Sequence, residues 1–478
     1  MRCRYGRGIP SVLFFCLAAF AQPQAPDTLW TRTFGGHGWD YAESVVSTPD
    51  GGCAIAGYAS DDTVASHAFI LRVNGQGDSL WGRRYGPPES SARAICLATD
   101  EGFIFGGIAQ DSSIADGCLS KVDEQGQQQW REVYDAGWNM LDIRAIRPTV
   151  DGGYIVGACG PGLSMSLLRT DSRGQEIWRC PFYAGTPFWV AGVGELADGS
   201  FLLAGTCDGP PPTYYATAFL AKASATGDSL WMRRYVSDTT TWCTGMTLTA
   251  DGGGLLCCHR DLGRPRAEIY LLRVDGEGNP LWMRALDDGG NSGANDAVEL
   301  ADGNFIVAGL TSSYGAQQSD YFLLKLSATG DSLWMRLYGT SGVEQAPRLA
   351  GSAETGFILA GWTLVPGRRW DIYVVKTAPL LPVDPPPAEI VHRFRLYPAY
   401  PNPFNGGTTI SFELDHDSDV VLAVFDVLGK EVATLWSGRQ AAGRHWVVWN
   451  AESLPSGSYF CRLSGDRTSQ TSRLLLLK

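Results

Sequence analysis

Residues 321–338, Tyr321-Phe322-Leu323-Leu324-Lys325-Leu326-Ser327-Ala328-Thr329-Gly330-Asp331-Ser332-Leu333-Trp334-Met335-Arg336-Leu337-Tyr338, decide the fold, because their pattern recurs along most of the chain. Its tryptophan returns at Trp30, Trp81, Trp130, Trp178, Trp231, Trp282 and Trp334. The intervals are 48 to 53 residues, and a period of this size is typical of a solenoid, an array or a propeller. Seven copies of one unit therefore fill most of the sequence.

Each unit reads as four short strands separated by turns. In the sixth unit, a strand over residues 295–300 precedes Asp302-Gly303, a dipeptide that tolerates the positive φ of a tight hairpin. Strands over residues 305–309, 321–326 and 332–338 complete the unit. Four antiparallel strands per repeat are typical of a propeller blade. The recurring tryptophan is predicted to fill the gap between adjacent blades, since burying it removes roughly 150–250 Å² from water.

The first strand of the chain is out of phase with the repeat. In the seventh unit the third strand, residues 371–376, is not followed by a fourth strand with a tryptophan. The strand that carries the remaining tryptophan, residues 27–34, lies instead before the first unit. We therefore predict an all-β protein with a seven-bladed β-propeller over residues 22–377. Its N-terminal strand closes the last blade and removes an exposed sheet edge. An eight-bladed ring or an open array is the alternative.

The N-terminus predicts export. Arg2, Arg4 and Arg7 precede an apolar run over residues 12–20, and Ala19-Phe20-Ala21 gives an A-x-A cleavage pattern, so residues 1–21 are predicted to be a secretory signal peptide. No other stretch is long and apolar enough to span a bilayer, which predicts a mature chain without a transmembrane segment. The net charge of −12 disfavours nucleic acid as a partner.

The cysteine count also bears on export. Ten of the twelve cysteines lie beyond the predicted cleavage point, and their positions do not repeat between units. Because exported proteins meet an oxidising compartment, we expect one or two disulfides and several buried thiols, with the pairing left open.

Residues beyond the repeats predict a second domain. A proline-rich segment over residues 378–391 is typical of a semi-rigid linker. Alternating strands over residues 408–414, 420–425, 444–449 and 457–463 then predict a small Ig-like β-sandwich over residues 392–478.

Four motifs in this segment carry a resemblance: Pro401-Asn402-Pro403-Phe404-Asn405, Val424-Phe425-Asp426-Val427-Leu428-Gly429-Lys430, Leu454-Pro455-Ser456-Gly457-Ser458-Tyr459-Phe460 and the terminal Arg473-Leu474-Leu475-Leu476-Leu477-Lys478. Residues 392–478 resemble the C-terminal sorting domain of bacterial type IX secretion substrates. The resemblance implies that the outer-membrane secretion machinery is a partner. It also implies a secreted, extracellular or outer-membrane surface location in a Gram-negative-type bacterium. An ordinary Ig-like spacer is the alternative.

The turn before each tryptophan carries a second resemblance, to the Trp repeats of quinoprotein dehydrogenases, as in Thr226-Gly227-Asp228-Ser229-Leu230-Trp231. This resemblance implies a redox cofactor and Ca²⁺, with Cys257-Cys258 as the adjacent cysteine pair. Ca²⁺ takes six or more oxygen ligands, and no matching set is found in the sequence. The cysteine pair aligns with Ala56-Gly57 and Ala308-Gly309, which favours packing. We predict no cofactor and leave Ca²⁺ in the channel open.

Candidate ligand-binding residues lie in the predicted loops that enter the first strand or leave the second strand of a blade, where propellers usually bind. They are Trp39, Asp40, Tyr41, Trp138, Trp189, Trp242, Asp296 and Trp362. Aromatics interleaved with carboxylates suit sugar rings or a protein surface. The alternative is that each aromatic only caps the top of its blade.

No motif predicts a catalytic or metal-binding residue. The sequence has no nucleophile elbow, H-E-x-x-H, Walker loop or Cys-x-x-Cys. We therefore predict an exported surface propeller that binds a glycan or a protein at the channel mouth without catalysis. One alternative is an extracellular carbohydrate-active hydrolase or lyase using two of Asp40, Asp142, Asp296 and Glu344. Another is a purely structural surface component.

Overall fold

The computed structural model describes residues 25–477 except 37, 61–64, 111–115, 135–140, 161–163, 184–186, 210–214, 264–265, 288, 314–315, 317, 365–368, 381–393, 398, 400, 403, 415, 427–429 and 466–467. The chain divides into two compact units between Leu381 and Pro382. The predicted signal peptide and most of the predicted linker lie outside the described residues.

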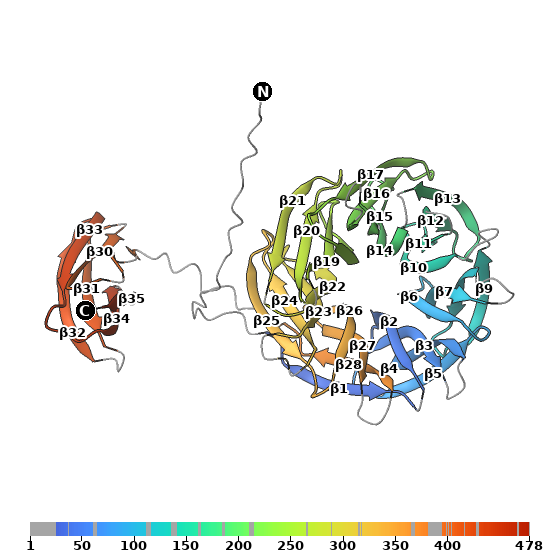
Figure 1. The fold of residues 1–478 in the computed structure, drawn as a ribbon, viewed down its shortest axis with the longest axis horizontal. Helices are drawn as coiled ribbons and strands as arrows, with labels where there is room; N and C mark the ends of the chain where they lie inside the picture. Colours follow the sequence, from blue (N-terminus) through green and yellow to red (C-terminus); the bar gives the residue numbers. More distant parts are fainter. Residues whose placement is uncertain are drawn as a thin grey trace. The chain divides into compact units, whose positions relative to one another are not determined.

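The first unit consists of seven four-stranded antiparallel sheets arranged in a ring (Figure 1). Blades 1 to 4 are β2 (Asp40–Ser47), β3 (Cys53–Ser60), β4 (Ser66–Val73) and β5 (Ser79–Tyr85); β6 (Ser91–Leu97), β7 (Phe103–Ala109), β8 (Asp116–Val122) and β9 (Gln128–Tyr134); β10 (Asp142–Pro148), β11 (Tyr154–Cys159), β12 (Ser164–Thr170) and β13 (Glu176–Tyr183); β14 (Pro187–Glu195), β15 (Phe201–Asp208), β16 (Ala216–Ala223) and β17 (Ser229–Tyr235). Blades 5 to 7 are β18 (Thr241–Leu248), β19 (Gly254–Gly263), β20 (Arg266–Val274) and β21 (Pro280–Leu286); β22 (Ser292–Glu299), β23 (Phe305–Thr311), β24 (Asp320–Leu326) and β25 (Ser332–Tyr338); β26 (Glu344–Ser352), β27 (Gly356–Leu364), β28 (Trp370–Thr377) and β1 (Thr28–Phe34). The predicted seven-bladed propeller is confirmed.

The N-terminal strand closes the ring as predicted. β1 pairs antiparallel with β28, from Thr28 opposite Thr377 to Phe34 opposite Ile372, and becomes the outer strand of blade 7. Figure 1 shows the dark-blue β1 lying along the orange β28. Every blade therefore has four strands, and the edge of β28 is covered.

Six of the recurring tryptophans, all except Trp334, contact the β-turn between the third and fourth strands of the next blade, which confirms their structural role. The indole N–H of Trp30 donates to the carbonyl oxygen of Gly75 at 2.8 Å, in the β4–β5 turn of blade 1. The same contact recurs from Trp81 to Glu124 and from Trp282 to Ala328. The ring of Trp30 also lies against Gly77, whose φ of 86° suits glycine.

A repeated ion pair anchors the hairpin between the first and second strands. In blades 1 to 6, the aspartate of this hairpin meets a lysine or arginine of the third strand. The distances include 2.8 Å for Arg72–Asp50, 2.6 Å for Arg273–Asp251 and 3.9 Å for Lys325–Asp302. The cationic side chains are nearly buried, whereas the aspartates are largely exposed. In each of these blades the ion pair therefore fixes the hairpin between the first and second strands to the third strand of the same sheet.

The predicted disulfides are wrong. All ten cysteines beyond the predicted cleavage point are free thiols, and only Cys159 is not fully buried. Apart from Cys257 and Cys258, which are adjacent on β19, they lie on different strands. Cys243 lies opposite Cys258 in the β18–β19 pairing. Burial raises the pKa of Cys257 and Cys258 well above the ordinary thiol value. Their predicted role as packing residues is confirmed.

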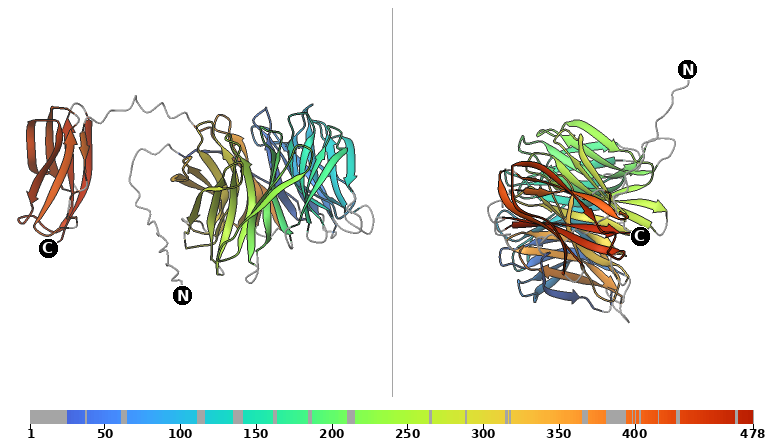
Figure 2. Two further views of the ribbon diagram at one scale, coloured as in Figure 1. Left: turned by 90° about the horizontal axis from the view of Figure 1, so that it is seen from above. Right: turned by 90° about the vertical axis from the view of Figure 1, so that its left-hand side faces the viewer.

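The second unit is a β-sandwich. One sheet contains β29 (Phe394–Leu396), β30 (Gly407–Leu414) and β33 (Gly443–Asn450), and the other contains β31 (Ser418–Phe425), β32 (Glu431–Gln440), β34 (Gly457–Gly465) and β35 (Thr468–Leu476). Figure 2 shows the two layers. Phe412, Leu422 and Leu463 lie in the core between them. Among the described residues, no helix is long and apolar enough to cross a membrane.

The Pro-Asn-Pro-Phe-Asn motif fastens the last strand of this unit. Asn402 donates to the carbonyl oxygen of Arg473 and accepts from the backbone N–H of Leu475, both at 2.8 Å. Phe404 is 3% exposed and exchanges backbone hydrogen bonds with Leu475 and Leu477. The motif therefore acts as a short added strand along β35.

Candidate functional site

The inner strand of every blade is interrupted by a β-bulge at the same level of the channel. The pairing of each inner strand with its neighbour shifts register at this level, and β14 has a second shift between Pro187 and Trp189. The residues skipped by the pairing are Glu43, Arg93, Arg144, Ala191, Thr244, Asn295 and the pair Ala346-Pro347. A bulge redirects a side chain away from the sheet face. The bulges thus bring residues of seven blades to one level.

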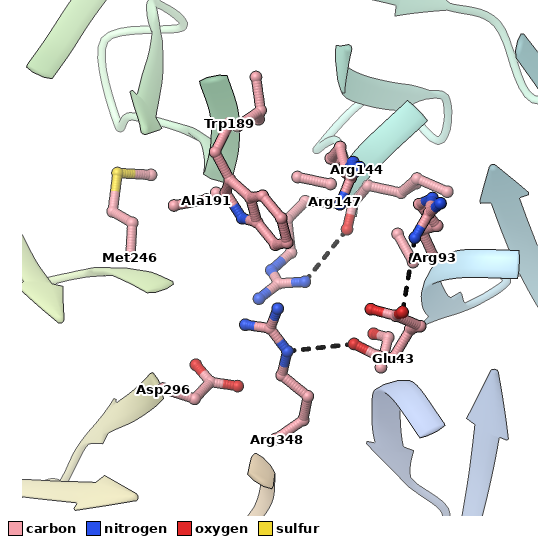
Figure 3. Close-up of a pocket in the computed structure, with 15 residues that line it drawn as sticks. Glu43, Arg93, Arg144, Arg147, Trp189, Ala191, Met246, Asp296 and Arg348 are labelled. Atoms are coloured by element: carbon pink, nitrogen blue, oxygen red, sulfur yellow. Dashed lines mark hydrogen bonds and ion pairs between the residues drawn. The ribbon is translucent and has the colours of Figure 1, made fainter. Parts of the chain in front are cut away.

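Ion pairs run along the channel wall across blades 1 to 3 (Figure 3). Arg93 lies 3.4 Å from a carboxylate oxygen of Glu43 and 3.1 Å from one of Asp142. The other oxygen of Asp142 accepts from Arg144 at 2.6 Å. The guanidinium of Arg144 also lies 4.2 Å from the ring centre of Trp189, a cation–π contact with blade 4.

Arg348 of blade 7 contacts the same channel wall. Its Nε donates to the carbonyl oxygen of Glu43 at 3.1 Å and its Nη1 to that of Thr244 at 2.8 Å, so one side chain joins blades 7, 1 and 5. Asp296 accepts from the backbone N–H groups of Ala297 at 2.9 Å and Leu349 at 3.1 Å. Burial raises the pKa of Asp296, although Arg348 opposes this shift.

These residues surround a cavity of about 50 Å³ in the channel. It is lined by Glu43, Arg93, Arg144, Arg147, Trp189, Asp296 and Arg348, among others. Sites for whole small molecules usually enclose roughly 300–1,000 Å³. A sugar ring therefore does not fit at this level of the channel, whereas a few waters or one small charged group do.

An aromatic cluster, defined as Trp39, Tyr41, Tyr58 and Trp362, lies where blades 1 and 7 meet. Trp39 stacks on Tyr41 with ring centres 6.1 Å apart, and Tyr41 stacks on Tyr58 at 4.7 Å. Trp362 meets Tyr41 edge-on at 5.1 Å. Trp39 is 40% exposed, and the guanidinium of Arg369 lies 5.4 Å from its ring centre.

The aromatic cluster borders the charged channel wall. Burial raises the pKa of Tyr41 to about 12, with further contributions from Tyr58 and Glu43. Burial also raises the pKa of Tyr58, and the charge of Glu43 adds to that shift. Glu43 thus lies beside both tyrosines while it pairs with Arg93. Sequence reasoning missed Tyr58, which follows the small residues Ala56-Gly57 inside a strand that otherwise reads as core.

The other predicted aromatics lie apart from this cluster. Trp242 stacks on His259 in blade 5, with ring centres 6.5 Å apart. Trp189 lies on β14 at the channel, and Trp138 lies outside the described residues. The prediction placed Asp40, Tyr41, Trp189, Trp242 and Trp362 in loops, whereas they lie on strands, because the inner two strands extend further toward this face than the sequence pattern indicates. Asp296 lies on β22, within the strand predicted over residues 295–300.

The four carboxylates considered for catalysis each have a structural partner. Asp40 is buried and accepts from the backbone N–H of Gly36 at 3.0 Å. Glu344, also buried, accepts from the hydroxyls of Thr340 at 2.7 Å and Thr363 at 2.9 Å. Asp142 pairs with Arg144, and Asp296 accepts from the backbone N–H of Leu349. These four residues come from blades 1, 3, 6 and 7.

Glu344 also faces a second carboxyl group, Asp320 of blade 6. Burial, and then the charge and hydrogen bond of Glu344, raise the pKa of Asp320 to about 6. A Cβ at Gly339 would collide with the Asp320 carboxyl, so the entry loop packs directly on it. At neutral pH the pair therefore holds two like charges in one buried place.

Asp320→Asn is expected to stabilise the propeller at pH 7.5 by on the order of 1 kcal/mol, after allowance for solvent screening. The folded chain retains a proton on Asp320 up to about pH 6 that the unfolded chain loses near pH 4, so this group favours folding less as pH rises through that window. The gain should vanish near pH 4.5 in thermal melts. Asp238→Asn, the same charge change at an exposed position, is the control. A gain that does not depend on pH would contradict the assignment.

Among solved structures, the chain is similar to PorZ of Porphyromonas gingivalis, a surface component of the type IX secretion system. The identity is 13% and the TM-score 0.46, and the match covers 93% of this chain and 60% of PorZ. The chain is also similar to a copper-bound fungal alcohol oxidase, with 12% identity, a TM-score of 0.47 and coverage of 95% of this chain and 100% of the oxidase, and to a Bacteroides caccae protein of unknown function, with 13% identity, a TM-score of 0.40 and coverage of 57% of this chain and 91% of that protein.

A search of curated proteins found no match. Residues 398–477, by contrast, match the family described as secretion system C-terminal sorting domain. That match covers the described sandwich from the Pro-Asn-Pro-Phe-Asn motif to the end of β35. It confirms the resemblance predicted from the four motifs and indicates export to the cell surface or the extracellular space. The second unit is therefore a type IX secretion sorting domain, carried behind a seven-bladed propeller.

Proposed function

We propose that the propeller is a surface module that binds a glycan without catalysing a reaction on it, and that the aromatic cluster is its contact surface. The observation that carries this is Trp39, a tryptophan that remains 40% exposed while its ring stacks on Tyr41. Tyr41 is in turn held by Tyr58 and Trp362 from two other strands. A rigid ring of this kind binds at low entropic cost.

The chemistry of the cluster suits a sugar. Carbohydrate rings present an apolar face that stacks on an indole and hydroxyls that accept hydrogen bonds at the rim. The guanidinium of Arg369 lies 5.4 Å from the ring centre of Trp39, so its N–H donors are beside the exposed part of the indole. A sugar that contacts the exposed part of the indole would also meet these donors.

Binding is favoured over catalysis by the state of the carboxylates. A glycosidase needs two carboxyl groups that face the substrate at roughly 5–10 Å separation. Asp40, Asp142, Asp296 and Glu344 instead satisfy backbone groups, hydroxyls and arginines of the ring itself. That no cofactor takes part stays a prediction.

The proposal is tested by screening the full mature chain against a broad glycan panel, with Trp39→Ala beside wild type. We expect at least one glycan to bind wild type and to bind Trp39→Ala about tenfold more weakly or worse, since a stacked aromatic contributes on the order of 1–3 kcal/mol. Trp446→Ala removes a still more exposed tryptophan from the sorting domain and should leave binding unchanged.

Three other outcomes would overturn the proposal. Release of product from any glycan would show that the propeller is an enzyme, as the hydrolase or lyase alternative predicts. Binding only to a protein partner, lost in Trp39→Ala, would keep the surface but replace the ligand class. Unchanged binding in Trp39→Ala would place the glycan elsewhere.

A further inference from the structure

The central channel contains more positive charge than its carboxylates neutralise. Arg93 and Arg144 are matched by Glu43 and Asp142 through contacts of 3.4 Å or less. No comparable partner exists for the two remaining channel arginines, Arg147 and Arg348: among the described residues, neither has a carboxylate within 4.0 Å. Asp296 lies nearby and is influenced by both, but it is already engaged by two backbone N–H groups.

The two unmatched guanidinium groups face each other. Figure 3 shows Arg147 reaching into the channel from blade 3 and Arg348 from blade 7, with their planar ends adjacent. Arg147 makes one backbone hydrogen bond, to its neighbour Ile146 at 3.1 Å, which leaves most of its five N–H donors available. Arg348 is held in place by carbonyl oxygens of three other blades. Two positive charges that point toward each other repel, and an anion held between them would offset that repulsion.

We propose that the channel binds a small oxyanion, a carboxylate, sulfate or phosphate group, between the guanidinium groups of Arg147 and Arg348. Arginine presents a planar pair of donors that matches two oxygens of such a group. The cavity of about 50 Å³ holds one group of this size and excludes a sugar ring. The anion could be free in solution or a substituent of a larger molecule that enters from the mouth.

The overall charge of the protein makes this site distinctive. The chain carries a net charge of −12, so its field repels anions and does not concentrate them. Anion binding should therefore depend on Arg147 and Arg348, because the net charge of the protein does not attract anions. Its occupancy does not require a glycan on Trp39, so the two proposals can fail separately.

The test is calorimetric titration of the full mature chain with inorganic sulfate, inorganic phosphate and acetate, each at constant ionic strength. We expect millimolar or tighter binding of at least one, and a matching rise in melting temperature. Arg147→Gln should weaken that binding by about tenfold or more, because a hydrogen bond to a charged group is lost. Arg147→Lys, which keeps the charge but not the planar donor pair, should weaken it less than Arg147→Gln.

Arg173→Gln is the matched control. It removes the same charge from an exposed turn of the same blade, outside the channel, and should bind as wild type does. Melting curves without added anion verify that each variant is folded. Binding of sulfate or phosphate alone would assign a tetrahedral oxyanion, and binding of acetate alone a carboxylate. Absence of binding by all three, or equal loss in Arg147→Gln and Arg173→Gln, would overturn the proposal.

Discussion

A chain that begins at Gly35, and therefore lacks β1, is expected to lose the cooperative thermal unfolding of the propeller. Without β1, the backbone groups of β28 from Ile372 to Thr377 have no partner on one side. Blade 1 loses the indole of Trp30 from its β4–β5 turn. Truncating a fully buried aromatic residue costs about 3–5 kcal/mol, so losing the partly buried Trp30 together with a whole strand is a large change against a net domain stability of about 5–15 kcal/mol.

The loss extends to blade 6. Tyr338 donates to the carbonyl oxygen of Pro26 at 2.8 Å, and Arg336 contacts Ala25 and Asp27. These residues occupy the place that the β-turn of the next blade takes elsewhere in the ring, as in Tyr85 donating to Gly126. Removal of the N-terminal segment therefore breaks the contacts of blades 6, 7 and 1 together.

Differential scanning calorimetry measures this effect, with two companion samples. Removal of residues 382–478 should leave the propeller transition in place, because they form a separate unit. A synthetic peptide of residues 25–36 added to the shortened chain should restore the transition in a concentration-dependent way. An unchanged transition in the shortened chain would show that blade 7 is stable with three strands.

Asp251→Ala is expected to lower the free energy of unfolding by about 2–3 kcal/mol at pH 7, since it leaves a nearly buried guanidinium without its carboxylate. The side chain of Arg273 is 6% exposed and meets both carboxylate oxygens of Asp251 at 2.6 Å. Asp251 also accepts from the hydroxyl of Thr249 at 2.7 Å and from the backbone of Gly253.

The cost should depend on pH. Partial burial opposes ionisation of Asp251, but the hydrogen bonds from Arg273, Thr249 and Gly253 outweigh it and hold its pKa below the ordinary value. A depressed carboxyl pKa contributes stability above the unfolded value, near 4, that is lost as pH falls through the folded value. Urea titrations at pH 7 and pH 3 should therefore show a smaller difference between wild type and variant at pH 3.

Asp302→Ala supplies the internal comparison. It removes the same side chain from the equivalent hairpin of blade 6, where Lys325 lies 3.9 Å away, so we expect a loss below about 1 kcal/mol. Arg273→Met with Asp251→Ala should recover most of the loss, because it replaces a buried charge by an apolar side chain of similar length. Equal losses in Asp251→Ala and Asp302→Ala would contradict the importance of the buried arginine.

Much of the propeller could be predicted because its signals are local. Trp334 and its six counterparts mark the outer strands, and Asp302-Gly303 marks a hairpin that needs a positive φ. The displaced strand around Trp30 predicted ring closure directly. A further signal was present but was not used. The third strand of each blade has a lysine or arginine one residue before its end, as in Lys325, and in blades 1 to 6 this residue meets the hairpin aspartate.

The candidate site could be predicted only in part, because it depends on contacts between blades. Trp39, Tyr41 and Trp362 were recognised as exposed aromatics, yet their meeting depends on blades 1 and 7 being neighbours in the closed ring. The channel arginines were missed for a different reason. Arg147 and Arg348 occupy different positions in their units, and only the bulges and the ring geometry bring them together.

Ring closure also has a consequence for the order of folding. β1 and β28 are hydrogen-bonded neighbours, yet nearly the whole propeller separates them along the chain. Joining them carries the entropy of closing a very long loop, whereas the hairpins within a blade form between adjacent segments. In a polypeptide delivered N-terminus first, the earliest strand must wait unpaired until the latest blade arrives. Closure would then be the rate-limiting step of maturation, and the free edge of β28 the point at which a stalled chain aggregates.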